Sequence, residues 1–272
     1  MTDHRPERGL DRRRDPIFVG YLPTPTRDRW FLGRSIPILL VVVAIIAAGL
    51  SSDQRPPGDG VWDLSTEVVL EGELVPGPYP VIRVADPEAV GGVRTWLLVE
   101  PGKFGTVPRL RELGIGDESG TTPVRARGFR IERDGRAMLE LLPGADGLEI
   151  VDGGTIASPP LETVRLEPTG SFRGEIVDAK CWLGVMKPGA GKPHKACATL
   201  CIDGGVPPML VWLDEEGRRR RAIVVGEDGE SIVARFRMLV ADPVVLVGRL
   251  EQRDDLVILR VDAADDAIRR AG

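Results

Sequence analysis

The sequence predicts a mainly β protein, with a single N-terminal transmembrane helix followed by two small OB-like β-barrel domains. Three observations predict this class. A charge-free apolar run spans residues 35–52. Glycine (33) and proline (23) are frequent among the 272 residues, which favours short strands and many turns over long helices. The remaining chain also contains the same pattern of apolar strands twice.

The apolar run at residues 35–52 has the composition of a membrane-spanning helix. Its 18 residues would span about 27 Å as a helix, close to the thickness of the hydrocarbon core of a bilayer. Trp30 and Phe31 precede the run and suit the membrane interface. A buried core helix and a cleaved signal peptide are the alternatives, but the long segment before the run disfavours a signal peptide. We therefore expect residues 35–52 to anchor the chain in a lipid bilayer.

Charges on either side of the run predict its orientation. Residues 1–34 contain eight arginines, whereas residues 53–73 contain one arginine and six acidic residues. Positively charged flanks stay in the cytoplasm. We therefore expect a cytoplasmic Arg-rich tail at residues 1–34 and export of everything after about residue 53.

The exported part divides into two halves that resemble each other. Two pairs of segments match: 71–75 with 173–177, and 124–135 with 244–255. A duplicated domain is the simplest explanation. The expected division is a linker at 53–64, a first OB-like domain at 65–151, a linker at 152–170, and a second OB-like domain at 171–272.

Apolar residues between turn signals predict the same series of elements in both halves. In the first half we expect strands near 67–75, 79–84 and 93–99, a short helix at 107–113, and strands near 123–131 and 136–142. In the second half we expect strands near 172–178, 208–214 and 220–225, a helical stretch at 229–238, strands at 243–250 and 255–262, and a polar terminal helix at 262–270. Three strands, a helix and two strands is the order of an OB-type barrel. A small β-sandwich or an open sheet is the alternative.

All three cysteines and one of the two histidines lie within residues 181–201, inside a loop that we expect at 179–207. Pro193 suits the first position of a helix, and no helix breaker follows before Gly204. Helical spacing would place three side chains on one face: His194, Cys197 and Cys201. The sequence therefore predicts a short helix with its sulfur and imidazole ligands on the same side.

Cys181, at the end of the preceding strand, would complete a Cys₃His metal site. The predicted ligands are Cys181, His194, Cys197 and Cys201. Such a set is typical of zinc, and its soft sulfur ligands also suit copper as Cu(I). Four further side chains are expected around the ligands or in the loop: Asp178, Met186, Lys192 and Lys195.

Two other interpretations of the cysteines stay open. Cys181 could form a disulfide with Cys197 or Cys201, which would staple the loop to the barrel and stabilise the fold by about 3 kcal/mol. The protein would then be a non-catalytic structural or assembly module with one spare thiol. Alternatively, a thiol whose pKa is lowered by nearby Lys and His would suit thiol–disulfide exchange.

Other classes of function have little support. The net charge of −5 gives a nucleic-acid partner no electrostatic support. Residues 187–192 are not a P-loop, because Met186 and Pro193 occupy the positions of the required Gly and Ser or Thr. The four arginines at 218–221 are expected to lie on a solvated hairpin edge. We predict no catalytic residue, and a binding role rather than catalysis.

The segment from Gly174 to Cys181, followed by His194 to Pro208, resembles small exported bacterial proteins with OB-like domains. These proteins share a Cys…His-x-x-Cys-Ala-x-x-Cys signature, and the likeness covers residues 174–208 closely. The resemblance implies a membrane-anchored bacterial protein, with its helix in the inner membrane and its domains in the periplasm. With the Cys/His cluster, we expect a protein that binds a metal or redox cofactor and assists a membrane or periplasmic redox protein.

Overall fold

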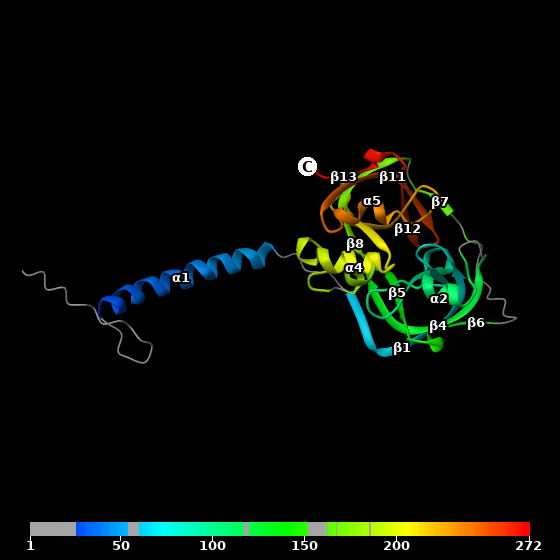
Figure 1. Cartoon of the computed structure of the whole chain (residues 1–272), viewed down its shortest axis with the longest axis horizontal. Coiled ribbons are helices and arrows are strands. Elements are labelled where there is room, and N and C mark those ends of the chain that lie inside the picture. Colours follow the sequence, from blue (N-terminus) through cyan, green and yellow to red (C-terminus); the bar gives the residue numbers. More distant parts are fainter. Residues whose placement is uncertain are drawn as a thin grey trace, which may run out of the picture. The chain divides into compact units, whose positions relative to one another are not determined.

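The computed structural model describes residues 26–53, 60–116, 120–151, 161, 163–166, 168–184 and 186–272 (Figure 1). The chain divides into two compact units, residues 1–56 and residues 57–272. Residues 1–25 of the expected Arg-rich tail, half of the expected linker at 53–64 and most of the expected linker at 152–170 lie outside the described residues. The predicted domain boundaries stay predictions.

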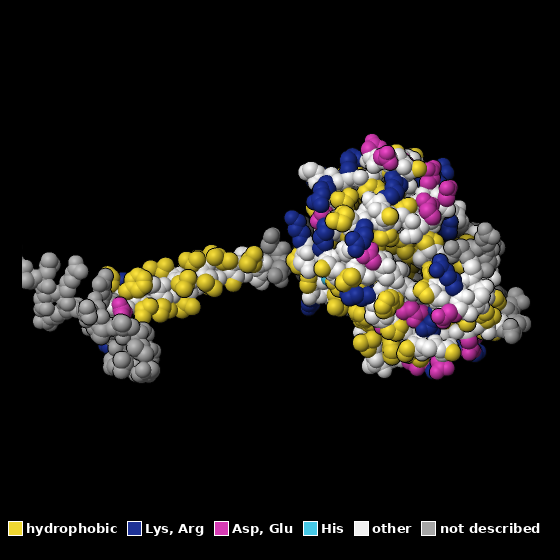
Figure 2. Space-filling view, in the orientation of Figure 1, with side chains coloured by type: hydrophobic (Ala, Val, Ile, Leu, Met, Phe, Trp, Pro, Cys, Tyr) yellow, Lys and Arg dark blue, Asp and Glu magenta, His cyan; other side chains and the backbone are white. Residues whose placement is uncertain are grey.

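The first unit contains one long helix, α1 (Thr26–Asp53). Within residues 28–52, the most apolar window of 18 residues has a mean hydropathy of 2.4, and the side chains are exposed nearly all around the helix. Figure 2 shows hydrophobic side chains along its whole length. The helix is therefore long and apolar enough to cross a membrane, a property that signal sequences share.

The second unit begins with a closed five-stranded barrel. Its strands are β1 (Gly60–Val75), β2 (Val81–Ala85), β3 (Val93–Val99), β4 (Thr122–Arg133) and β5 (Arg136–Leu141). The strand order is β1-β2-β3-β5-β4, and β4 pairs back onto β1, so the barrel closes without a free edge. Helix α2 (Val107–Glu112) connects β3 to β4, and β6 (Leu148–Ile150) adds to the end of β4.

A second closed barrel has the same connectivity. Its strands are β8 (Gly170–Asp178), β9 (Pro208–Leu213), β10 (Arg219–Val225), β11 (Pro243–Arg253) and β12 (Leu256–Val261). The order is β8-β9-β10-β12-β11, and β11 pairs back onto β8. The short helix α5 (Val233–Phe236) connects β10 to β11, while β7 (Thr163–Arg165) and β13 (Ile268–Arg270) also pair with β11. The mainly β class, with a helix after the third strand of each half, is confirmed.

The predicted terminal helix at 262–270 is wrong. Residues 268–270 form strand β13, in which Ile268 lies opposite Leu246 of β11. Ile268 also packs against the core of the second barrel. The segment has too few apolar residues for a helix to bury a face, whereas a strand satisfies its backbone groups on β11.

Two glycines occupy equivalent places in the two barrels, Gly128 in β4 and Gly248 in β11. A Cβ at either position would lie 2.1 Å from the carbonyl oxygen of Glu140 or of Arg260 on the adjacent strand. Only glycine allows so close an approach of two backbones. This shared constraint supports the duplication that the sequence predicts.

Each barrel has its own apolar core, and a third apolar cluster joins the two barrels. The third cluster combines Leu97 and Ile131 of the first barrel with Val177 and Ile258 of the second. Because its residues come from both barrels, burying them requires the barrels to pack against each other.

An ion pair also joins the barrels. The guanidinium of Arg83, on β2, donates to both carboxylate oxygens of Asp254 at 2.7 and 3.1 Å, and to Glu73 at 2.8 Å. The side chains of Arg83 and Asp254 are only 2% and 8% exposed. Because the guanidinium group is planar and makes two parallel hydrogen bonds to the carboxylate, this pair restricts the position of one barrel relative to the other.

Replacing Arg83 by methionine should lower the free energy of unfolding by about 3–5 kcal/mol, because it leaves the Asp254 carboxylate buried without its counter-charge. Urea unfolding of the full chain in detergent, followed by tryptophan fluorescence, measures the change. The control is Arg94→Met, which removes a more exposed pair with Asp86 and should cost less than about 1 kcal/mol. Equal losses in the two variants would contradict the role of the buried pair.

Candidate metal centre

The connection between β8 and β9 folds into two short helices, α3 (Ala179–Leu183) and α4 (Lys195–Asp203). Asp178, the last residue of β8, caps the start of α3: its Oδ1 accepts a hydrogen bond from the backbone N–H of Cys181 at 2.7 Å. Pro193 lies in a 3₁₀ turn, Lys192–His194, that leads directly into α4. The predicted helix after Pro193 is confirmed, while Cys181 lies in a helical turn and not at the strand end.

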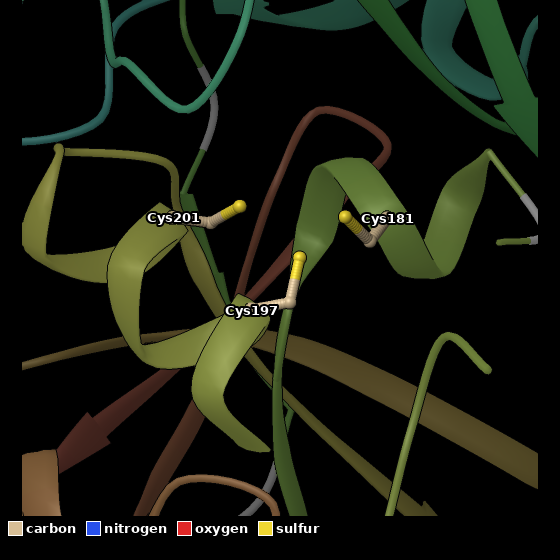
Figure 3. A group of neighbouring side chains, drawn as sticks. All are labelled: Cys181, Cys197 and Cys201. Atoms are coloured by element: carbon tan, nitrogen blue, oxygen red, sulfur yellow. The ribbon is translucent and has the colours of Figure 1, made fainter. Parts of the chain in front are cut away.

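The three cysteine sulfurs converge between these helices. Cys197 and Cys201 are one turn apart on α4, and Cys181 faces them from α3 (Figure 3). Their sulfur atoms all lie within 4.8 Å of one another. All three cysteines belong to the described part of the chain, and each is a free thiol. The disulfide considered as an alternative is therefore not formed, and the structure has three thiols around one point.

The thiols differ in burial and in their affinity for protons. Cys181 and Cys201 are 6% and 1% exposed, whereas Cys197 is partly exposed. A hydrogen bond from the Cys181 thiol lowers the pKa of Cys201 to about 7, although burial opposes this shift. The same bond, with burial, raises the pKa of Cys181. Cys201 therefore loses its proton before Cys181 does, and Cys181 is the donor of the hydrogen bond.

Two lysines supply positive charge to the thiols. Lys103, in the loop after β3 of the first barrel, has its Nζ 2.7 Å from Sγ of Cys197 and 3.6 Å from Sγ of Cys201. The pKa of Lys103 is raised, mainly by its hydrogen bond to Cys197. Lys180 is buried, which lowers its pKa, and its Nζ donates to the carbonyl oxygens of Glu100 and Gly102 at 2.8 Å. The first barrel therefore contributes to the site.

Close backbone packing holds the loop that carries Lys103. The N–H of Gly105 donates to the carbonyl oxygen of Gly204 at 2.8 Å. A Cβ at Gly204 would lie 1.9 Å from the carbonyl oxygen of Lys103. The glycine that ends α4 thus lets the loop of the first barrel approach the cysteines.

Sequence reasoning missed Lys103, which lies 94 positions before Cys197. The signal that could have found it is composition. The chain has five lysines, and four of them lie near the cysteines in sequence. The fifth is Lys103, in a chain that otherwise uses arginine for positive charge.

His194 lies beside the thiols in a second group. Its Nε2 is 2.9 Å from Oδ2 of Asp178, and both side chains are buried. Potential ligand atoms of Asp178, Cys181 and His194 lie within 4.8 Å of one another. Among the described residues, the compact three-thiol group does not include His194. The structure therefore brings three of the four predicted ligands together. The fourth, His194, lies just before α4, and its imidazole bonds to Asp178 instead.

The other predicted side chains lie elsewhere. Met186 and Lys192 are exposed. Lys195 bonds to the carbonyl oxygen of Met238 at 2.8 Å and to the carboxylate of Asp242 at 2.9 Å. Lys195 therefore stabilises the loop rather than the thiol charge. Asp178 contacts two predicted ligands, Cys181 and His194, through its side chain, whereas Met186 contacts Cys181 through its backbone N–H at 3.0 Å.

Comparison of the chain with family models, with curated proteins and with solved structures gave no match. The chemistry of this cluster is therefore what indicates the function.

Replacing Asp178 by alanine should lower the free energy of unfolding by about 2–4 kcal/mol, since it removes a helix cap and leaves the buried His194 without its partner. Thermal and urea unfolding of the full chain measure this loss. The control is Asp203→Ala, which removes an exposed pair with Arg237 and should cost less than about 1 kcal/mol. A wild-type stability in Asp178→Ala would show that the Asp178–His194 bond does not hold the loop.

Proposed function

We propose that Cys181, Cys197 and Cys201 bind one thiophilic metal ion, zinc or Cu(I). The observation that carries this proposal is the convergence of three free sulfurs, from two helices, within 4.8 Å of one another. Thiolates are the ligands that both ions prefer. If the cysteines only filled the core, their three sulfur atoms would not need to lie at one point.

The charge around the sulfurs also supports a metal. Three thiolates carry a charge of −3, which one divalent or monovalent cation offsets only in part. The ammonium group of Lys103 contacts two of the sulfurs. A buried charge needs a partner of opposite sign, so this lysine stabilises the anionic remainder of a metal–thiolate centre.

His194 and Asp178 support the site by holding Cys181. Asp178 accepts a bond from the backbone of Cys181 and another from the imidazole of His194. Such outer partners orient ligands, and their loss typically weakens metal binding by about 10–100-fold. The sulfur set leaves a zinc ion one position short of four, which His194 or an external ligand would fill.

We further propose that both barrels are OB-like and that α1 anchors them to the inner membrane, with the barrels in the periplasm. The strand order and the helix between the third and fourth strands of each barrel support the first point. The arginines of residues 1–34 support the second. A metal site on such an anchored domain suits an accessory protein of a membrane or periplasmic redox system.

Thiol–disulfide exchange is the second candidate, because the pKa of Cys201 is lowered to about 7. Burial weighs against it. Cys181 and Cys201, which share a hydrogen bond, are both buried, and exchange requires that an attacking sulfur reach its target in line. Metal binding needs no such access by a second protein, so it remains the better supported function.

The full chain, purified in detergent under reducing conditions, should bind one zinc or Cu(I) ion per chain. Mutation of Cys181, Cys197 or Cys201 to serine should each weaken binding at least about 100-fold, and His194→Gln about 10–100-fold. Elemental analysis and competition with a chromogenic chelator measure these values.

Met186→Leu is the control, because Met186 carries an exposed thioether. This variant should bind as the wild type does. Circular dichroism of each cysteine variant separates loss of ligands from loss of fold. A folded wild-type protein that binds neither metal would contradict the proposal.

Protease added to intact spheroplasts that express the full chain should release a fragment containing both barrels, because the expected linker at residues 53–64 lies on the outer side of the membrane. Immunoblotting of the membrane and soluble fractions measures the release. Protection until the cells are lysed would contradict the orientation, and a soluble chain before protease is added would indicate a cleaved signal sequence.

A further inference from the structure

Lys103 and Cys197 lie closer together than an ordinary hydrogen bond to sulfur allows. Their Nζ and Sγ atoms are 2.7 Å apart. Bonds from N–H to oxygen span about 2.7–3.2 Å, and sulfur is a larger atom than oxygen. The contact between Lys103 and Gly204, described above, holds the lysine at this place.

Access favours oxidation of Cys197 over the other two cysteines. Cys197 is partly exposed, whereas Cys181 and Cys201 are buried. Lys103 is partly exposed as well. Oxidation of thiols depends on exposure, which is greatest for Cys197 among the three. An oxidant that enters from solvent therefore reaches Cys197 first, and this sulfur lies nearer to the nitrogen of Lys103 than that of Cys201 does.

We propose that oxidation of the metal-free chain links Lys103 to Cys197 through a single oxygen atom, as an N–O–S bridge between the two barrels. The oxidant is a peroxide. One thiol, one amine and two molecules of hydrogen peroxide give the bridged product and three molecules of water. One S–H bond, one N–H bond and both O–O bonds break, while one S–O and one O–N bond form in the protein. Sulfur and nitrogen each lose two electrons, and each peroxide accepts two.

The bridge has two consequences for the molecule. It ties the loop after β3 covalently to α4, so the barrels can no longer separate. It also occupies the sulfur of Cys197, so that only two thiols remain free for a metal. This second consequence rests on the proposed metal function, whereas formation of the bridge does not.

Mass spectrometry of the full chain in detergent tests the bridge. After treatment with a chelator and then with hydrogen peroxide, the intact mass should increase by one oxygen atom and decrease by two hydrogen atoms. A tryptic digest should contain a cross-linked pair of peptides, uncut after Lys103, that joins Lys103 to Cys197. Both Lys103→Arg and Cys197→Ser should abolish this product.

Lys195→Arg is the matched control. Lys195 lies two positions from Cys197 on the same helix, but its Nζ bonds to Asp242. This variant should form the bridge to the wild-type extent. A product that only gains oxygen, a product that only loses two hydrogens as a disulfide does, or a bridge that persists in Lys103→Arg would overturn the proposal.

A parallel sample loaded with zinc separates this proposal from the proposed function. Zinc on the thiolates should prevent the bridge, and peroxide should then leave the zinc bound. If the bridge forms equally with and without zinc, the metal function is contradicted and the bridge stands. If chelator-treated protein forms no bridge, the bridge is overturned, whatever the zinc-loaded sample does.

Discussion

Packing of one barrel on the other is the constraint on which the rest of this structure depends. The apolar cluster between the barrels includes Cys181 and Cys201 together with Leu97 and Ile131 of the first barrel. Burial of this surface therefore places the loop after β3 against the helices that carry the sulfurs. The Arg83–Asp254 ion pair further limits how the barrels can pack, since the packing must bury the apolar cluster and also bring these two charges together.

The sequence predicts much of the fold because each barrel is built from local patterns. Alternating apolar residues and glycine-rich turns specify strands such as β3 and β12 within a residue or two. Pro193 and Gly204 mark the limits of the segment that contains α4. The error at residues 262–270 arose where no local pattern decides. A short polar segment can take either conformation. Here β12 pairs only with residues 248–253 of β11, so residues 244–246 of β11 can pair with a further strand, β13.

The sequence predicts the parts of the site that lie within one element and not the contacts between elements. Helical spacing correctly places Cys197 and Cys201 on one face, since that relation lies within a single element. The partners of His194 and the position of Lys103 depend on contacts between elements. His194 bonds to Asp178 across the loop, and Lys103 arrives from the other barrel. Spacing along the chain carries no information about either contact. The concentration of lysines near the cysteines does indicate that the remaining lysine, Lys103, belongs to the site.

The close approach of Lys103 to Gly204 also bears on the order in which the molecule is assembled. Domains tend to fold as units, the N-terminal one first, as the chain is synthesised. The loop that carries Lys103 belongs to the earlier barrel, so it can already have its shape when the later helix reaches it. Cys197 and Cys201 would then meet the positive charge of Lys103 as soon as α4 packs against this loop. The first barrel, which has no cysteine, would in this way guide the folding of the helix that carries two of them.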